Sequence, residues 1–152
     1  MKFPVLIPFV EELGMELQAM GDGRATLTVD LRDAHLNSWE VAHGGVMMTL
    51  LDVAMAHAAR SLLHGRTADG LGVVTLEMKT SFMRPGLGRL RAEGVLLHRS
   101  TTLAFTEGSV FNEAGELCAH ATATFKFIHA LPTGKRRLNA LQRQDDATGD
   151  AP

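Results

Sequence analysis

The segment VMMTLLDVAMAHAARSLL, residues 46–63, decides the fold that we expect for this chain. It contains neither glycine nor proline and is apolar on nearly all sides, so it predicts one long helix covered on most of its surface. At about 100° per residue, Thr49, Asp52, Ala56 and Arg60 fall on one narrow stripe of small or polar side chains. The charged residues within the segment argue against a membrane-spanning helix and favour a helix at the centre of a folded domain.

Strand patterns follow this helix along the chain. Residues 72–82 alternate with a period of two, which predicts a strand with Val74, Leu76, Met78, Thr80 and Phe82 on one face. Further strands are predicted over 89–99, 102–111 and 116–128, with a turn at 112–115. The last strand has a clear apolar face, made by Leu117, Ala119, Ala121, Ala123, Phe125 and Phe127.

The residues before the helix predict a short helix over 8–13 and a hairpin of strands 15–20 and 24–31 around residues 21–23. Residues 33–45 are irregular. The element order therefore predicts an α+β fold in which one antiparallel β-sheet wraps around one long central α-helix. We expect a single domain over 1–130 and a polar, flexible tail over 131–152. One helix leaves apolar surface and strand edges uncovered, so we expect a homo-oligomer, at least a dimer.

The composition sets limits on function. The chain has 152 residues, 45% of them hydrophobic and 21% charged, with a formal net charge of −2, so we expect no general attraction to nucleic acid or to anionic membranes. The single cysteine, Cys118, excludes an internal disulfide and a cysteine-based metal site. The proline-broken N-terminal segment lacks the features of a signal peptide, and we expect a cytoplasmic protein.

The junction between the irregular loop and the long helix carries the candidate chemistry. Asn37 is followed six residues later by His43, then by Gly44 and Gly45 at the helix start, and Asp52 lies inside the apolar helix. Free N–H groups in the first turn of a helix can bind a carbonyl oxygen or an oxyanion, and glycine allows close approach. Each feature also has a structural interpretation: a tight turn for the glycines, and a structural hydrogen bond or an oligomer interface for the aspartate. The other histidines show no metal-ligand spacing, so we assign no metal.

The combination of these motifs resembles the hotdog-fold acyl-CoA thioesterases, in particular the phenylacetate-pathway group of the 4-hydroxybenzoyl-CoA thioesterase superfamily. The resemblance extends through three further segments and covers about residues 13–128. These segments are TSFMRP (80–85), TTLAF (101–105) and NEAGELCAHA (112–121).

The resemblance implies a role for each residue of the candidate site. Asp52 would attack the thioester carbonyl or activate a water molecule that does so, while the backbone N–H of Gly45 would polarise the carbonyl. Asn37 and His43 would orient the water, the carbonyl or the loop, and the Thr75 hydroxyl would assist the water. The family builds each site from both subunits of a dimer, and its dimers often pair again, so we expect a homodimer that assembles into a homotetramer.

Coenzyme A is expected here as part of the substrate, and no separate cofactor is expected. A net-acidic chain needs local cations for its phosphates, and Arg84 and Arg99, each near a strand end, are the candidates. Thr101 and Thr102 could add donors, and Phe82 is also placed at the substrate. Both arginines have the alternative interpretation of ordinary solvated surface residues.

Two other functions remain open from the sequence. One is a hotdog protein that binds acyl-CoA without hydrolysing it, because fold does not determine function. The other is a hotdog enoyl-CoA hydratase or dehydratase, although Asp52 lies nine residues after His43 and that chemistry usually uses a different spacing. The chain lacks a Gly-x-Ser-x-Gly motif, which disfavours an α/β-hydrolase. The identity of the acyl group also remains open.

Overall fold

The computed structural model of this chain describes residues 1–63 and 71–129. The predicted tail at 131–152 therefore lies outside the described residues. The elements are α1 (Pro8–Glu12), β1 (Met15–Gly21), β2 (Arg24–Asp30), the short 3₁₀ helix η1 (Asp33–His35), α2 (Gly44–Arg60), β3 (Gly72–Phe82), β4 (Arg89–Arg99), β5 (Leu103–Phe111) and β6 (Leu117–Ile128).

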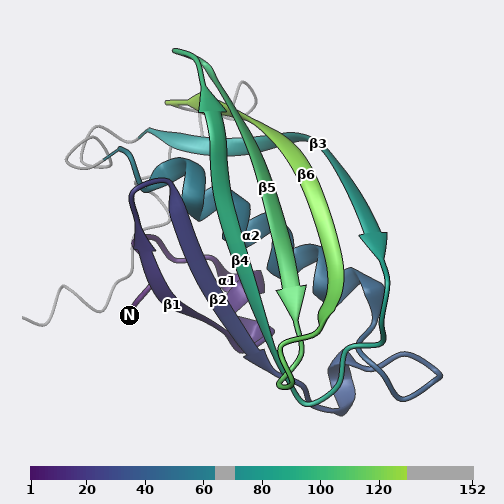
Figure 1. Ribbon diagram of the computed structural model, residues 1–152. Coiled ribbons are helices and arrows are strands. Elements are labelled where there is room, and N and C mark those ends of the chain that lie inside the picture. The colour runs from purple at the N-terminus through teal and green to yellow at the C-terminus, as the bar shows by residue number, and fades with distance from the viewer. Residues whose placement is uncertain (64–70, 130–152) are drawn as a thin grey trace, which may run out of the picture.

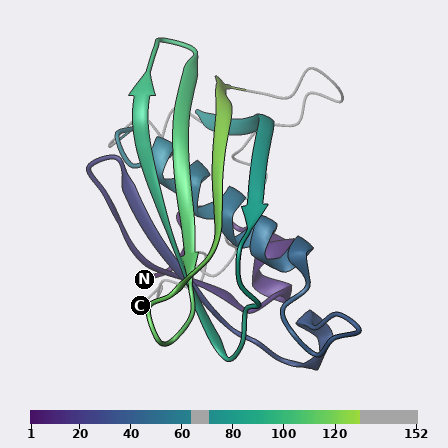
Figure 2. The same ribbon diagram turned by 45° about the vertical axis from the view of Figure 1, so that its right-hand side comes forward.

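The strands form one six-stranded sheet in the order β1-β2-β4-β5-β6-β3, and every neighbouring pair is antiparallel. Figures 1 and 2 show this sheet curving across one side of α2. The predicted α+β fold, an antiparallel sheet wrapped around one long helix, is confirmed. β1 and β3 are the two edge strands, so β3 has its second hydrogen-bonding edge unpaired within this sheet.

The first hairpin forms where the sequence predicts it. β1 pairs with β2 across a two-residue turn in which Asp22 has φ 49° and Gly23 has φ 76°. Positive φ at both central positions matches the right-handed twist of the flanking strands, which is why a glycine is favoured here. The short helix α1 also forms as predicted, with Gly14 at φ 66° just beyond it.

The central helix packs directly onto the middle of the sheet. Its side chains Leu50, Leu51, Ala54, Met55 and Ala58 are completely buried. At Gly94 in β4, an added methyl group would overlap the backbone carbonyl of Ala54, so only glycine allows the helix and the sheet to approach this closely. The helix runs from Gly44 to Arg60, starting two residues earlier and ending three residues earlier than predicted.

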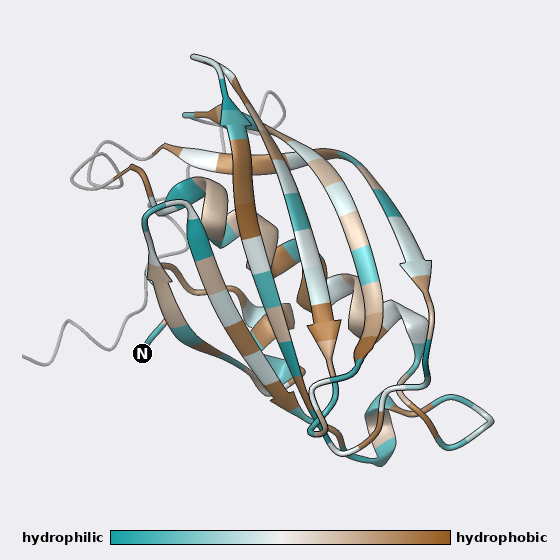
Figure 3. Cartoon of the chain, viewed as in Figure 1, coloured by the Kyte–Doolittle hydropathy of each residue, from teal (hydrophilic) through white to brown (hydrophobic). Residues whose placement is uncertain are grey.

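The alternation of apolar and polar residues holds along most strands (Figure 3). In β6, the predicted apolar face is confirmed from Ala119 onward, with Ala119, Ala121, Ala123, Phe125 and Phe127 all buried. Leu117, also predicted on this face, is only partly buried, because the pairing with β5 shifts register beside Cys118.

The predicted apolar face of β3 is wrong for Val74 and Leu76, before the pairing resumes at Glu77, but it holds for Met78, which packs against the core. A bulge between Thr75 and Glu77 takes Leu76 out of the pairing with β6, and Leu76 is 54% exposed instead of lying on the apolar face. A bulge adds one residue and so reverses which side chains point to each face. Thr75 therefore turns toward the helix, together with Val73 and Met78.

Candidate functional site

Nearby side chains form hydrogen bonds with the backbone of the first turn of α2. His43 is the N-cap residue, and its Nδ1 accepts a hydrogen bond of 2.9 Å from the backbone N–H of Gly45. A Cβ on Gly45 would lie 3.0 Å from that same nitrogen, so glycine permits the close approach of the ring. One turn later, the Thr49 hydroxyl donates to the Gly45 carbonyl oxygen over 2.8 Å. In the single chain, the amide predicted to polarise a substrate carbonyl thus already has a partner.

Asn37 shapes the loop that leads into the helix. Its side-chain oxygen accepts hydrogen bonds from the backbone N–H groups of Trp39, at 2.9 Å, and Val41, at 3.4 Å. Glu40 adopts φ 57°, a left-handed conformation that this bonded loop maintains. The side-chain amide nitrogen of Asn37 is therefore the end of the group that can donate to a ligand.

Asp52 lies in the middle of α2 and meets Thr75 from β3. The Thr75 hydroxyl donates to Oδ1 of Asp52 over 2.7 Å. Burial raises the pKa of the Asp52 carboxyl, and the hydrogen bond from Thr75 only partly opposes this shift. The bulge at Leu76 is what turns Thr75 toward the helix, so a local irregularity in the strand assembles this pair.

A cavity of about 430 Å³ opens beside Asp52 and Thr75. Its walls are predominantly apolar and come from the N-terminal segment, the stripe side of α2, and β3 and β6. The lining residues are Val5, Ile7, Phe9, Val10, Met48, Thr49, Asp52, Val53, Ala56, His57, Arg60, Val73, Thr75, Met78 and Phe125. The predicted stripe Thr49, Asp52, Ala56 and Arg60 forms one wall of this cavity along its length.

The start of α2 faces a different cavity. His43 and Gly45 line a space of about 370 Å³, to which Leu36, Val46 and Leu13 also contribute. Thr49 borders both cavities. Within one chain, the structure therefore brings Asp52 to Thr75, and it brings His43 to Gly45, but it places these two pairs in separate cavities.

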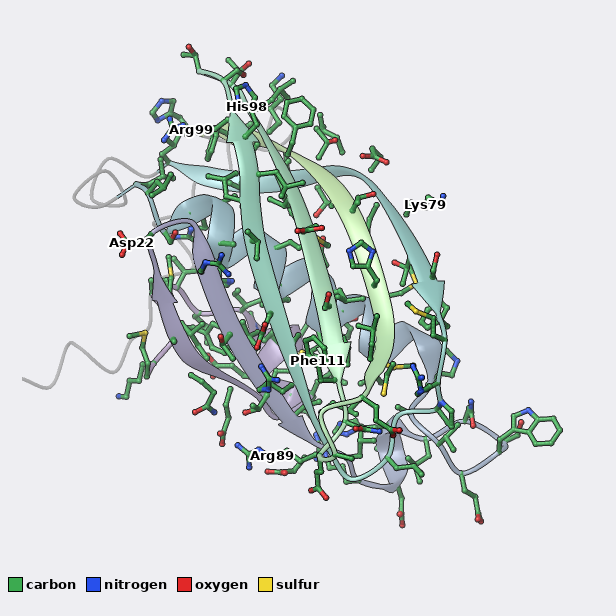
Figure 4. All side chains as sticks on the ribbon, viewed as in Figure 1. Asp22, Lys79, Arg89, His98, Arg99 and Phe111 are labelled. Atoms are coloured by element: carbon green, nitrogen blue, oxygen red, sulfur yellow. The ribbon has the colours of Figure 1, made fainter. Side chains whose placement is uncertain are left out.

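The residues predicted to bind coenzyme A fall into two groups at opposite ends of β6. Arg84 follows β3 and donates from Nη1 to the Leu117 carbonyl oxygen over 2.9 Å, at the start of β6. Arg99 lies at the far end of β4, with its guanidinium 5.1 Å from the centre of the Phe127 ring, near the end of β6 (Figure 4). One chain therefore cannot use both arginines at the same phosphate.

Each arginine has its own neighbours among the predicted residues. Thr101 and Thr102 lie beside Arg99 in the turn before β5, where the backbone N–H of Thr102 donates to the Ser100 hydroxyl over 3.3 Å. Phe82 lies near Arg84, and its ring is 3.3 Å from the position of a Cβ on Gly44. Phe82 is thus the predicted substrate residue that reaches the start of α2.

Sequence reasoning missed two residues at the far end of the Asp52 cavity. His57 is 1% exposed; Nδ1 bonds the Val53 carbonyl oxygen at 2.8 Å, and burial lowers its pKa to about 4. Arg60 is 4% exposed, and burial lowers its pKa. The signal for Arg60 was present, because it stands on the same stripe as Asp52. The contribution of Val5, Ile7 and Phe9 left no such periodic signal in the sequence.

No cluster of three or more potential metal ligands is found among residues 1–63 and 71–129. Within the same residues, no helix is long and apolar enough to cross a membrane. Cys118 is buried in β6, and burial raises the pKa of its thiol, so the thiolate that a nucleophile needs is disfavoured.

Comparisons with known proteins give a consistent result. The family model described as the thioesterase superfamily matches residues 40–119, more than half of the chain. The acyl-coenzyme A thioesterase PaaI of Escherichia coli is 32% identical over 74 residues, which are 49% of this chain and 48% of that protein.

Solved structures agree with the sequence comparisons. A mutant of the phenylacetic acid degradation protein PaaI from Thermus thermophilus is 31% identical, with a TM-score of 0.69 over 79% of this chain and 98% of that one. The conserved protein PA5202 of Pseudomonas aeruginosa is 28% identical, with a TM-score of 0.75 over 82% of this chain and 97% of that one.

Proposed function

The chain belongs to the thioesterase superfamily as a PaaI-like hotdog thioester hydrolase, and from that premise we propose that it cleaves acyl-CoA thioesters with Asp52 as its catalytic carboxylate. The observation that carries the proposal is the Asp52–Thr75 pair at 2.7 Å, set in a largely apolar cavity of about 430 Å³. Apolar walls suit an acyl chain, and a carboxylate beside it suits attack on the activated carbonyl.

Asp52 can act in two ways in this geometry. As a nucleophile, it would form an anhydride with the acyl group and release the CoA thiolate, after which water cleaves the anhydride. As a general base, it would take a proton from a water molecule that attacks the carbonyl directly. The Thr75 hydroxyl holds Oδ1 in place and leaves Oδ2 for either role. Single-turnover hydrolysis in oxygen-18 water identifies the nucleophilic route if the label appears in Asp52, which happens when water attacks the Asp52 carbonyl of the anhydride.

The carbonyl oxygen needs a donor, and we assign this role to the Gly45 N–H. His43 holds that amide in the single chain, so a bound carbonyl oxygen either shares the N–H with the imidazole or displaces it. Asn37 lies in the preceding loop, where its side-chain nitrogen can donate to the water or the carbonyl. The helix N-terminus adds its partial positive charge to the same place.

We further propose that two subunits share each site. Asp52 lies seven residues beyond Gly45, roughly 10 Å along the helix axis at 1.5 Å per residue, whereas attack requires about 3 Å. This separation agrees with the finding that Asp52 and Gly45 of one chain line different cavities. A partner helix lying antiparallel to α2 would bring its own start beside Asp52.

The edge formed by β3 supplies a surface for such pairing. Leu76 is 54% exposed, Phe82 49% and Met83 47%, and all three belong to β3 or directly follow it. Exposed apolar side chains on an unpaired strand edge are unfavourable in water and are covered when two sheets join. We propose a homodimer built in this way, which pairs again into a tetramer.

Release of free thiol from a panel of acyl-CoA substrates tests the reaction class. Hydrolysis of several acyl-CoAs, without hydration of an enoyl-CoA, is the expected result. Stoichiometric binding of acyl-CoA without thiol release, or hydration of the double bond, would contradict the proposal.

Mixed dimers test the shared site. Asp52→Ala and Asn37→Ala are unfolded together and refolded, provided that each variant is inactive alone. A heterodimer then carries one site with both lesions and one intact site, so a random mixture should regain about a quarter of wild-type activity. A mixture that has exchanged subunits, as shown by mass spectrometry, and yet stays inactive would rule out sharing.

A further inference from the structure

Arg60 is the last residue of α2 and lies at the end of the Asp52 cavity, with 4% of its surface exposed. Its Nε and Nη2 atoms are buried and have no hydrogen-bond partner within residues 1–63 and 71–129. A buried cation without a partner is costly, because it loses its hydration and gains nothing in return. A protein retains such a group when a ligand or a partner supplies the missing anion.

Among residues 1–63 and 71–129, no acidic side chain forms an ion pair with Arg60. The C-terminal end of a helix favours a cation, but this field provides no hydrogen bond to the guanidinium. His57, one turn earlier, is neutral at pH 7 because its pKa is about 4. Of the described residues that line the cavity, only Asp52 is acidic, and it lies eight residues away, roughly 12 Å along the axis.

We propose that Arg60 binds a carboxylate at the far end of the acyl chain, so that the preferred substrates are short ω-carboxyacyl-CoA thioesters. This inference rests on the proposed function, because it takes Asp52 as the place where the thioester lies. The substrate would then span the cavity from the thioester at Asp52 to its own carboxylate at Arg60.

The cavity wall between Asp52 and Arg60 leaves room for an acyl chain. Ala56 stands halfway between Asp52 and Arg60 on the same stripe and lines the cavity, so its small side chain leaves room for a chain of methylene groups. Val73, Met78 and Phe125 provide apolar contacts opposite. Long side chains of a helix lean toward its N-terminus, which brings the guanidinium back toward Ala56 and favours a short acyl chain.

Charge explains why a carboxylate is preferred to a methyl group at this position. A neutral acyl chain would fill the cavity and leave Arg60 buried without a partner. A carboxylate would pair with Arg60 through charge-assisted hydrogen bonds, which are stronger than neutral ones. His57 Nε2 also has no partner among the described residues, so a hydroxyl group is the competing ligand, able to accept from Arg60 and donate to His57.

Three substrates of equal length separate these possibilities: adipyl-CoA, 6-hydroxyhexanoyl-CoA and hexanoyl-CoA. We expect wild-type kcat/KM to be highest for adipyl-CoA. In Arg60→Met, the ratio of adipyl-CoA to hexanoyl-CoA activity should fall on the order of 100-fold, and Arg60→Lys should retain part of it. Arg24→Met is the matched control, because it removes an exposed arginine at the start of β2 and should leave the ratio unchanged.

Several outcomes would overturn the inference while the proposed function stands. They are a wild-type preference for hexanoyl-CoA, equal activity on the hydroxylated substrate, and an Arg60→Met variant that loses both activities equally. The last result would mean that Arg60 supports the fold or pairs with another subunit.

Binding measurements keep the inference testable if no acyl-CoA is hydrolysed. The non-hydrolysable thioethers S-(5-carboxypentyl)-CoA and S-hexyl-CoA are titrated into wild-type protein and Arg60→Met by calorimetry. Tighter binding of the carboxylated thioether, lost in Arg60→Met, would support the inference even if the thioesterase proposal failed. Equal binding of the two thioethers by wild-type protein would overturn it.

Discussion

The first turn of α2 and its last three turns differ in how fully their polar groups are hydrogen-bonded. At the start, Gly45 donates to His43 and accepts from Thr49, so both backbone polar groups of Gly45 have a partner within the chain. Toward the end, Asp52 has one side-chain partner, while His57 and Arg60 keep buried nitrogen atoms that find none among the described residues. The same helix thus has hydrogen-bonded polar groups at its start and buried polar atoms without described partners toward its end.

This difference indicates which end of the helix has hydrogen-bonding groups available for a ligand. Satisfied groups at the start of α2 stabilise the helix, since capping removes an unpaired N–H. Buried groups without partners farther along reduce stability and become favourable only when something binds them. The cavity beside Asp52, rather than the one beside His43, is therefore where we expect ligand binding to change the protein most.

The largest expected effect comes from Asp52. Asp52→Asn keeps the shape of the side chain but removes the nucleophile or base, so turnover of acyl-CoA should fall on the order of 10²–10⁴-fold. Steady-state thiol release measures this loss. Near-normal turnover in a correctly assembled Asp52→Asn protein would make Asp52 a structural residue.

The same variant should be more stable than wild type at neutral pH. Burial raises the pKa of Asp52, so the folded state binds a proton more readily than the unfolded state, and stability falls as pH rises through that window. Asparagine carries no charge and removes this penalty. A rise in the urea midpoint at pH 7 is expected, and a fall would show that the ionised carboxylate stabilises the fold.

His57 should make the protein sensitive to acid. Burial lowers the pKa of His57 in the folded state to about 4, against 6.5 for an unperturbed histidine. The unfolded state therefore takes up the proton first, and stability is lost as pH falls through that interval. The loss attributable to His57 is about 3 kcal/mol by pH 4. Urea unfolding at a series of pH values should show a smaller loss in His57→Phe.

His98→Phe is the matched control for this experiment, because it makes the same histidine-to-phenylalanine change at an exposed position. Its pH dependence of unfolding should follow that of wild type. If His57→Phe also followed wild type, the buried ring would not be the source of the acid sensitivity.

Thr75 should affect the chemistry more than the fold. Thr75→Val keeps the size of the side chain but removes the hydrogen bond to Asp52, and we expect about a 10-fold loss of kcat. Because that bond lowers the pKa of Asp52, the acid limb of the pH–rate profile should also move to higher pH. Thr75→Ser should retain both properties. An unmoved acid limb in Thr75→Val would mean that the bond does not act on Asp52 in solution.

The smallest expected effect lies at the satisfied end of the helix. His43→Ala removes the acceptor that caps the Gly45 N–H, and the free energy of unfolding should fall by about 1 kcal/mol. His43→Asn supplies another capping oxygen and should recover most of this loss. Equal stability of His43→Ala and wild type in urea would show that the first turn does not depend on its cap.

Much of the fold could be predicted because its elements carry regular patterns. The apolar face of β6 arises from residues that alternate from Ala119 to Phe127, and β4 has the predicted bounds although its pairing with β5 shifts between Leu96 and His98. The bulge at Leu76 could not be predicted this way. Apolar and polar residues continue to alternate through it, whereas the pairing with β6 shifts by one residue between Thr75 and Glu77.

The site was predictable only in part. The family resemblance named Asp52 and Thr75, and the structure brings them together, but no pattern in the sequence shows that a hydroxyl on β3 reaches the middle of α2. Arg60 had a visible position on the stripe, yet the cavity beside it is completed by segments distant in the sequence. Arg84 and Arg99 were chosen because each lies near a predicted strand end. Local sequence patterns cannot show that these two strand ends lie at opposite ends of β6.

The close contact at Gly94 bears on how such a protein can evolve. The sheet side of α2 fits against backbone, so Gly94 accepts no larger residue, and the neighbouring Ala54 has no space to grow. The opposite side of the same helix faces the Asp52 cavity, where side chains such as Ala56 and Arg60 border open space rather than closely packed backbone. New acyl specificities should therefore arise by drift along one side of α2 while the other side stays invariant, which makes the fold readily adaptable to new thioesters.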